Sequence, residues 1–144
     1  MKILMTLAAA VALAVLSLHA ADPAATYVDH DKVAEAFAKG GALAQGSDFS
    51  ASVARRAGPG QVEVHEKETD IFYITEGDAM FITGGTMVGG KLSRPGQWLG
   101  TDIQGGVTHH LTKGDIITIP AGVPHWFKEV KSPILYYMVK VIRP

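Results

Sequence analysis

The stretch GDIITIPAGVPH, residues 114–125, predicts a short strand held between two sharp turns. Gly114 permits the turn that leads into the strand, while Pro120 and Gly122 force a bend directly after it. That bend directs the side chain of His125 back toward the face of the sheet. A lone histidine after a turn is usually structural or solvated, so a binding role for His125 requires partners from elsewhere in the chain.

A second stretch, VEVHEKETD at residues 62–70, contains candidate partners. Valines alternate with Glu63 and His65, and because side chains alternate across a strand, these two residues should project from one face. Asp70 follows five residues after His65. The three side chains form either a metal site or the solvated edge of a strand. Since the chain has no cysteine, any metal must be bound by nitrogen and oxygen donors.

The stretch that ends at His125 resembles the second motif of the cupin superfamily, G-x5-P-x-G-x2-H-x3-N. The match is complete through His125, and Glu129 stands in place of the final asparagine. With the first motif described next, the resemblance spans the chain from about residue 58 to residue 140.

The first cupin motif, G-x5-H-x-H-x3,4-E-x6-G, is matched less closely. Gly77 fits its last glycine, and His65 falls on its second histidine. Glu63 stands where the first histidine belongs, and Asp70 stands where the glutamate belongs. Both replacements remain potential metal ligands.

The resemblance implies an all-β fold, a jelly-roll β-barrel that holds one divalent metal in its interior. In this superfamily the two histidines and the glutamate of the first motif and the histidine of the second bind the metal. Carried over, the ligands are Glu63, His65, Asp70 and His125. Two imidazoles and two carboxylates suit manganese, iron or zinc. A cupin that has lost its metal and uses the cavity for binding is the alternative.

Aromatic side chains are expected around these donors. Phe72 shares the strand face of Asp70, and Phe127 shares that of His125, so both should line a substrate pocket with apolar walls. Ile74 lies on the same face as Phe72, and we expect it to take part in core packing.

His109 is the third candidate for the substrate pocket. It shares strand parity with Leu111 and points inward if Leu111 does, which leaves His110 facing outward. Either histidine could serve as an acid or base near neutral pH. The alternative is one core histidine beside one surface histidine.

The remainder of the mature chain is read as short strands between glycine turns, preceded by one short helix in residues 29–41. Half of the sixteen glycines fall in residues 84–106. A connection of this length is either a lid or binding loop, or an extra hairpin that meanders.

The N-terminus predicts an export signal. Lys2 precedes an apolar run at residues 3–18, which is shorter than the ~20 residues of a bilayer span, and small residues follow at Ala20 and Ala21. We therefore expect a signal peptide at residues 1–20, an N-terminal helix and strands at 21–57, and a cupin core at 58–144. The mature protein should be periplasmic or secreted, with no stable membrane anchor.

Charge and patterning limit the partners. Thirteen basic and fourteen acidic residues give no basic excess, which argues against nucleic acid. Strands such as PILYYMVKVI, apolar on both faces, favour a homodimer.

The predicted function is metal-dependent action on a small organic molecule, of the oxygenase, decarboxylase, isomerase or lyase type. The alternatives are non-catalytic binding of a sugar or other metabolite, and a structural or storage role.

Overall fold

A computed structural model describes residues 24–144, and the expected signal peptide lies outside this range. Its single helix in that range, α1 (His30–Lys39), begins where the side chain of Asp29 accepts a hydrogen bond from the backbone N–H of Lys32 at 3.0 Å. It ends at Gly40, whose positive φ of 73° suits glycine. No helix within residues 24–144 is long and apolar enough to cross a membrane.

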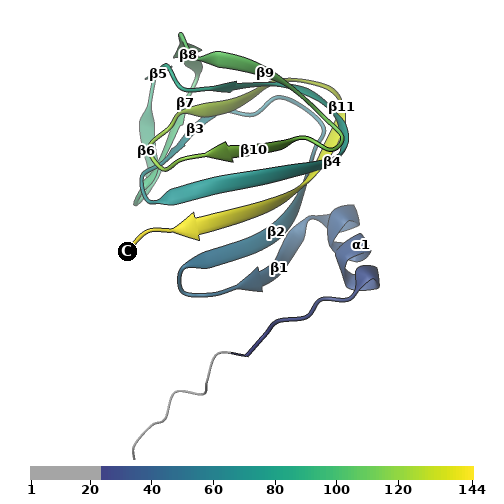
Figure 1. Ribbon diagram of the computed structural model, residues 1–144. Coiled ribbons are helices and arrows are strands. Elements are labelled where there is room, and N and C mark those ends of the chain that lie inside the picture. The colour runs from purple at the N-terminus through teal and green to yellow at the C-terminus, as the bar shows by residue number, and fades with distance from the viewer. Residues whose placement is uncertain (1–23) are drawn as a thin grey trace, which may run out of the picture.

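The rest of the described chain is antiparallel β-structure, which confirms the predicted all-β jelly-roll fold (Figure 1). The strands are β1 (Gly41–Gln45), β2 (Phe49–Arg56), β3 (Val62–His65), β4 (Glu68–Thr83), β5 (Thr86–Val88), β6 (Lys91–Arg94), β7 (Gln97–Gly100), β8 (Asp102–Gln104), β9 (Val107–Thr112), β10 (Ile116–Ile119) and β11 (His125–Ile142).

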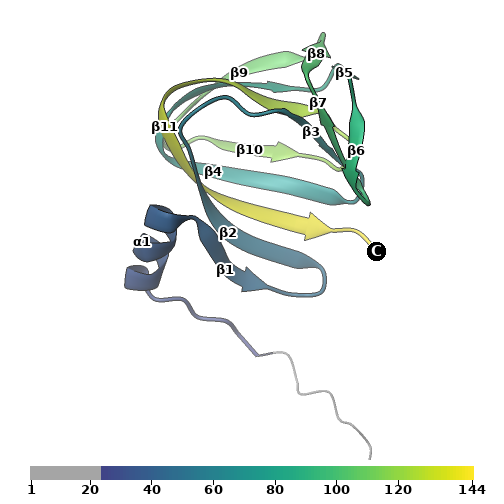
Figure 2. The same ribbon diagram turned by 180° about the vertical axis from the view of Figure 1, so that it is seen from behind.

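Two long strands, β4 and β11, run through both walls of the barrel. The first half of β4 and the second half of β11 pair with each other and with β10 and β2, which β1 extends. Their other halves pair with β9 and β3, and β7 and β6 continue that wall. Figure 2 shows the barrel from the side of β3, β7 and β6.

Gly77 explains how β4 can pass between the walls. Its φ is 94°, and a Cβ at this position would collide with the backbone carbonyl of Pro133 on β11. The pairing of β4 with β11 shifts register on both sides of this contact. The sequence predicts two strands separated at Gly77, whereas the structure has one bent strand of 16 residues.

The core lies between the two walls and is continuous with the floor of the site described below. Its buried members are Phe72, Ile74, Ala79, Phe81, Leu111, Ile119, Phe127, Ile134 and Tyr136. As expected, Ile74 is fully buried in this cluster, and Phe72 on the same face of β4 also lines the cavity.

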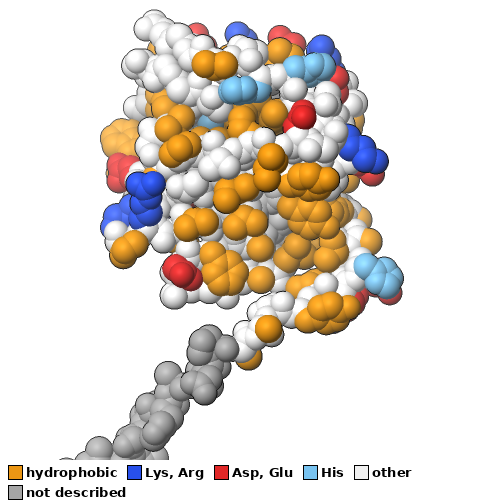
Figure 3. All heavy atoms as spheres, in the orientation of Figure 1, with side chains coloured by type: hydrophobic (Ala, Val, Ile, Leu, Met, Phe, Trp, Pro, Cys, Tyr) orange, Lys and Arg blue, Asp and Glu red, His pale blue; other side chains and the backbone are white. Residues whose placement is uncertain are grey.

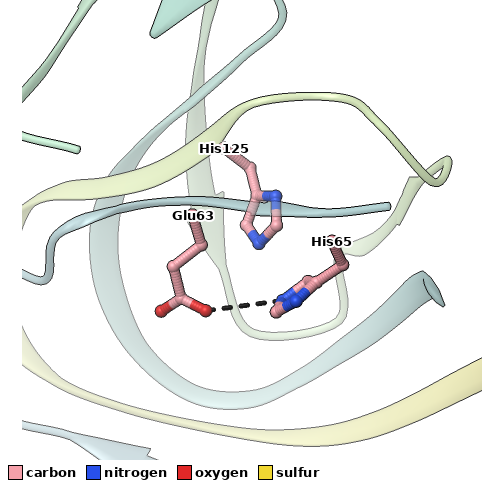
Figure 4. Close-up of side chains that lie close together, drawn as sticks. All are labelled: Glu63, His65 and His125. Atoms are coloured by element: carbon pink, nitrogen blue, oxygen red, sulfur yellow. Dashed lines mark ion pairs between the residues drawn. The ribbon is translucent and has the colours of Figure 1, made fainter. Parts of the chain in front are cut away.

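The glycine-rich segment 84–106 forms the four short strands β5 to β8, which supports the meandering hairpin among the two alternatives. Ile103 from β8 packs with Val62 and Ile82 in a second, smaller apolar cluster. Val62 is thus buried against this cluster, while Glu63, next to it on β3, points into the barrel (Figure 4).

The outer face of β2, β11, β4 and β10 is apolar and only partly covered. Helix α1 covers one end, where Phe37 packs edge-on against Tyr137 with ring centroids 5.0 Å apart. Beyond the helix, large side chains remain exposed, namely Phe49, Tyr73, Ile116 and Val141. Figure 3 shows hydrophobic side chains gathered over these strands.

Candidate metal centre

The four residues predicted as metal ligands lie close together inside the barrel. Glu63 and His65 come from β3, His125 opens β11 directly opposite Glu63, and Asp70 comes from β4 in the other wall. His65 Nε2 lies 3.4 Å from Glu63 Oε2 and 3.5 Å from Asp70 Oδ2, and His125 Nε2 lies 3.7 Å from Asp70 Oδ2. Figure 4 shows Glu63 and the two imidazoles pointing toward one another.

Both imidazoles present Nε2 to this centre and turn Nδ1 away from it. His125 Nδ1 lies 3.1 Å from the carbonyl oxygen of Val123, and His65 Nδ1 lies 3.5 Å from Glu68 Oε2. The carbonyl oxygen accepts a hydrogen bond from the proton held at His125 Nδ1 and leaves the Nε2 lone pair for a cation, whereas His65 Nδ1 makes no hydrogen bond within the described residues. Burial lowers the pKa of His125, which favours the neutral imidazole that a metal requires.

The carboxylates of Glu63 and Glu68 are held in their ionised forms. A hydrogen bond with His65 lowers the pKa of Glu63 despite its burial, and the charges of His125, His65 and Arg56 act in the same direction. Burial raises the pKa of Glu68, but its hydrogen bond and charge interaction with Lys140 outweigh that effect, so the pKa is lowered overall. Ionised carboxylates are the form that binds a metal.

Asp70 has a cationic partner inside the barrel. Lys140 Nζ lies 2.7 Å from Asp70 Oδ1 and 2.9 Å from Glu68 Oε2. Asp70 is only 2% exposed, and Oδ2, the oxygen that faces the two imidazoles, is not the one that Lys140 contacts. Asp70 can therefore bind Lys140 and a metal through different oxygens.

The donors fit a divalent metal. One ligand atom each from Glu63, His65 and His125 lie within 4.8 Å of one another, and a second such group joins His65, Glu68 and Asp70. Imidazole nitrogen with carboxylate oxygen is a combination suited to manganese, iron and zinc. Sequence reasoning missed Glu68, although its spacing of two from Asp70 places it on the same strand face.

The donors border a cavity of about 290 Å³ between the two walls. Phe72 and Phe127 line it, as the sequence indicated. The other lining residues are Ala54, Arg56, Gln61, Glu63, His65, Asp70, Arg94, Gln97, His125, Trp126, Tyr136, Met138 and Lys140.

The structure does not place His109 in this cavity, which corrects the sequence-based prediction. His109 Nε2 lies 2.8 Å from Thr83 Oγ1, and His109 is absent from the cavity lining. The physical reason is strand order, because β4 and β11 separate β9 from β3 and its ligands. Its neighbour His110 does face outward, where Nε2 lies 2.9 Å from Asp78 Oδ2.

Arg56, Tyr136 and Lys140 are polar lining residues that sequence reasoning did not assign to the site. Lys140 shares strand parity with Tyr136 and Met138, so an inward-facing lysine in an apolar strand was the available signal. Tyr136 belongs to the buried core and also lines the cavity. Burial raises the pKa of its hydroxyl, and the nearby charge of Arg56 opposes that rise.

Comparison with known proteins agrees with this architecture. The sequence model of a family described as Cupin matches residues 18–141 of the chain. A search of curated proteins found no match.

Solved structures are similar in fold. BH2720 from Bacillus halodurans aligns with a TM-score of 0.58 at 15% identity, covering 82% of each chain. TT1209 from Thermus thermophilus aligns at 0.54 and 19% identity, covering 83% of this chain and 100% of that one. KdgF from Halomonas sp. aligns at 0.52 and 17% identity, covering 73% and 80%. Identities this low show a shared fold alone.

Proposed function

The chain belongs to the cupin family, and from that premise we propose that it binds one divalent metal and acts on a small organic molecule in the adjoining cavity. The observation that carries the proposal is the shared orientation of His65 and His125, whose Nε2 atoms face the carboxylates of Glu63 and Asp70. Together with the cavity beside them, these four side chains resemble a metal centre that opens onto a substrate pocket.

The chain's own groups would prepare the centre for binding. The carbonyl of Val123 orients the imidazole of His125 through Nδ1, which leaves Nε2 facing Asp70. A bound divalent metal would supply Lewis-acid chemistry to a ligand in the cavity. The apolar walls formed by Phe72 and Phe127 would exclude water from that ligand.

The reaction types that fit such a site are oxidation by dioxygen, decarboxylation, isomerisation and lyase chemistry. The centre contains two imidazoles and a carboxylate, which is the ligand set of the non-haem iron oxygenases. The fold does not select among these reactions. The proposed activity is therefore metal-dependent chemistry on a molecule small enough for the cavity, with the reaction type left open.

A non-catalytic binding protein is the second candidate, and one observation favours it. Lys140 already neutralises Asp70 at 2.7 Å, so the barrel can remain folded without a metal to balance that carboxylate. In that case the cavity would bind a sugar or another metabolite without converting it. Turnover measured on any compound that binds separates the two candidates.

Elemental analysis tests the metal. Protein prepared without chelators should contain close to one manganese, iron or zinc ion per chain, and His125→Ala should lose it. His110→Ala is the matched control, because His110 is half exposed on the outside of the barrel. Metal-free protein that takes up none of the three ions on titration would rule out the metal centre.

The proposal includes export and action outside the cytoplasm. Its support is the apolar run at residues 3–18 followed by small residues at Ala20 and Ala21. The intact mass of exported protein should correspond to a chain that starts near Ala21. A soluble fraction with the mass of all 144 residues would contradict this expectation.

A further inference from the structure

Arg56 presents a guanidinium group that its surroundings hold in place at the cavity. Its Cζ lies 5.0 Å from the centroid of the Phe127 ring. On another side lies Gly60, where a Cβ would come within 2.6 Å of Nη1. The Gly60 N–H donates to the carbonyl of Phe127 at 3.0 Å, and the Gly60 carbonyl accepts from Trp126 Nε1 at 2.8 Å. Gly60 is therefore fixed to β11 and leaves room for the guanidinium.

The hydrogen-bonding capacity of Arg56 is incompletely used. Its Nε is buried and has no hydrogen-bond partner among the described residues. Its Nη2 lies 4.0 Å from Glu63 Oε1, which is too long for a hydrogen bond. The side chain keeps 28% of its surface exposed and lines the cavity. A partly buried donor without an acceptor is costly, so an acceptor that enters the cavity would be bound favourably.

The cavity restricts the chemistry of that acceptor. Lys140 is already paired with Asp70 at 2.7 Å. Arg56 has no ion pair this short, since Glu63 lies 4.0 Å from it. The guanidinium fork matches a planar carboxylate, which it can bind through two parallel hydrogen bonds. The carboxylates of Glu63 and Asp70, which also line the cavity, would repel a ligand with several negative charges.

Apolar surface is available for the rest of the ligand. Phe72, Met138 and the aromatic ring of Tyr136 line the cavity from the same wall as Arg56, and Phe127 lies beside the guanidinium. A ligand that fits this lining has one carboxylate and a small apolar body. Because Arg56 lies near Glu63, a ligand carboxylate bound to Arg56 would lie beside the candidate metal centre.

We propose that Arg56 binds the carboxylate of a small monocarboxylic acid, whose apolar body lies against Phe72, Tyr136 and Met138. This inference rests on the proposed function, since it assumes that the ligand occupies the same cavity, and it adds the substrate class. The competing explanation is that Arg56 serves only as a counterion for Glu63. A counterion would influence metal affinity without distinguishing an acid from its amide.

Calorimetric titration tests the inference with three acid and amide pairs as probes: acetate and acetamide, pyruvate and pyruvamide, benzoate and benzamide. Each probe is titrated into metal-loaded protein and into chelator-treated protein. At least one acid should bind ~10-fold or more tightly than its amide in both preparations, because charge-assisted hydrogen bonds contribute this much. Arg56→Gln should abolish the preference, and Arg56→Lys should retain part of it.

Arg55→Gln is the matched control, since it removes the same charge from the exposed face of the same strand. It should leave the acid preference within ~2-fold of wild type. Gly60→Ala displaces the guanidinium without removing it and should weaken the acid ~10-fold. Gly60→Ala and Arg56→Lys decide the question if Arg56→Gln does not fold.

The inference is overturned if no acid binds better than its amide, or if the folded Arg56 variants keep the wild-type preference. Failure of the metal centre gives a different result. Protein that takes up no metal but prefers an acid, and loses this preference in Arg56→Gln, would support Arg56 and reject the metal proposal.

Discussion

Lys140 Nζ lies 2.7 Å from Asp70 Oδ1 inside the barrel, where it joins two neighbouring strands of the same wall, β11 and β4. Asp70 stands at the position of a metal-binding glutamate in the cupin motif. Because Lys140 contacts it, the buried negative charge of Asp70 is balanced by the protein itself. The pair is almost fully shielded from water, since the two side chains are 2% and 16% exposed.

Lys140→Met is expected to destabilise the fold by about 3–5 kcal/mol, because it leaves the charge of Asp70 buried without a partner. Urea unfolding of metal-free protein measures the loss. Lys131→Met, an exposed lysine on the same strand, should change the free energy of unfolding by less than about 0.5 kcal/mol. Equal effects of the two substitutions would show that the Lys140 pair contributes little.

The same substitution should have the opposite effect on the metal. Removing the positive charge of Lys140 leaves Glu68 and Asp70 uncompensated, so divalent ions should bind ~10-fold or more tightly to Lys140→Met than to wild type. Competition titration with a chelator dye measures the affinity. Weaker binding in Lys140→Met would mean that Lys140 positions Asp70 for the metal more than it competes with it.

Glu63→His restores the histidine of the family motif. We expect the metal to be retained with an affinity within ~10-fold of wild type, since an imidazole replaces a carboxylate as a ligand. Glu63→Ala should lose ~10-fold or more, because it removes a ligand altogether. Any activity should change in Glu63→His, because the net charge of the site rises by one. Equal affinities of wild type and Glu63→Ala would exclude Glu63 as a ligand.

The core of the candidate site was predictable because it depends on local geometry. Strand parity places Glu63 and His65 on one face, and the bend between Pro120 and Gly122 directs His125 toward them. These relationships need only the pleat of a strand and the chemistry of a turn. The residues that hold these ligands in place come instead from the pairing of distant strands.

Lys140 and Asp70 show what a single sequence leaves undetermined. They are neighbours through the register of β4 with β11, which joins positions 70 residues apart. Arg56 was overlooked for a related reason, because two adjacent arginines are typical of a solvated strand end, and only the pairing with β11 turns the second one inward. His109 was misplaced because parity predicts a face but not the distance along the sheet.

Tyr136 should resist ionisation at alkaline pH, because burial raises the pKa of its hydroxyl above the ordinary value of 10.0. The folded state then binds the proton more tightly than the unfolded state. Its contribution to stability is fully present below pH 10.0 and is lost as the pH rises through the pKa of the folded form. Ultraviolet titration should show Tyr136 among the last tyrosines to ionise, and Tyr136→Phe should remove that late component. A late component that survives in Tyr136→Phe would assign it to another tyrosine.

The exposed apolar face of β10, β4, β11 and β2 predicts a homodimer. Ile116 and Tyr73 lie directly opposite each other on neighbouring strands and are 68% and 46% exposed. Such a face is unusual for a monomer, and burying it against a second copy would remove apolar surface from water. Wild-type protein should sediment as a dimer at micromolar concentration, and Ile116→Glu with Tyr73→Glu should shift it to monomer. Val107→Glu is the control, since Val107 is 60% exposed on β9 and outside this face. A wild-type monomer at micromolar concentration, or a dimer that survives the double substitution, would contradict the prediction.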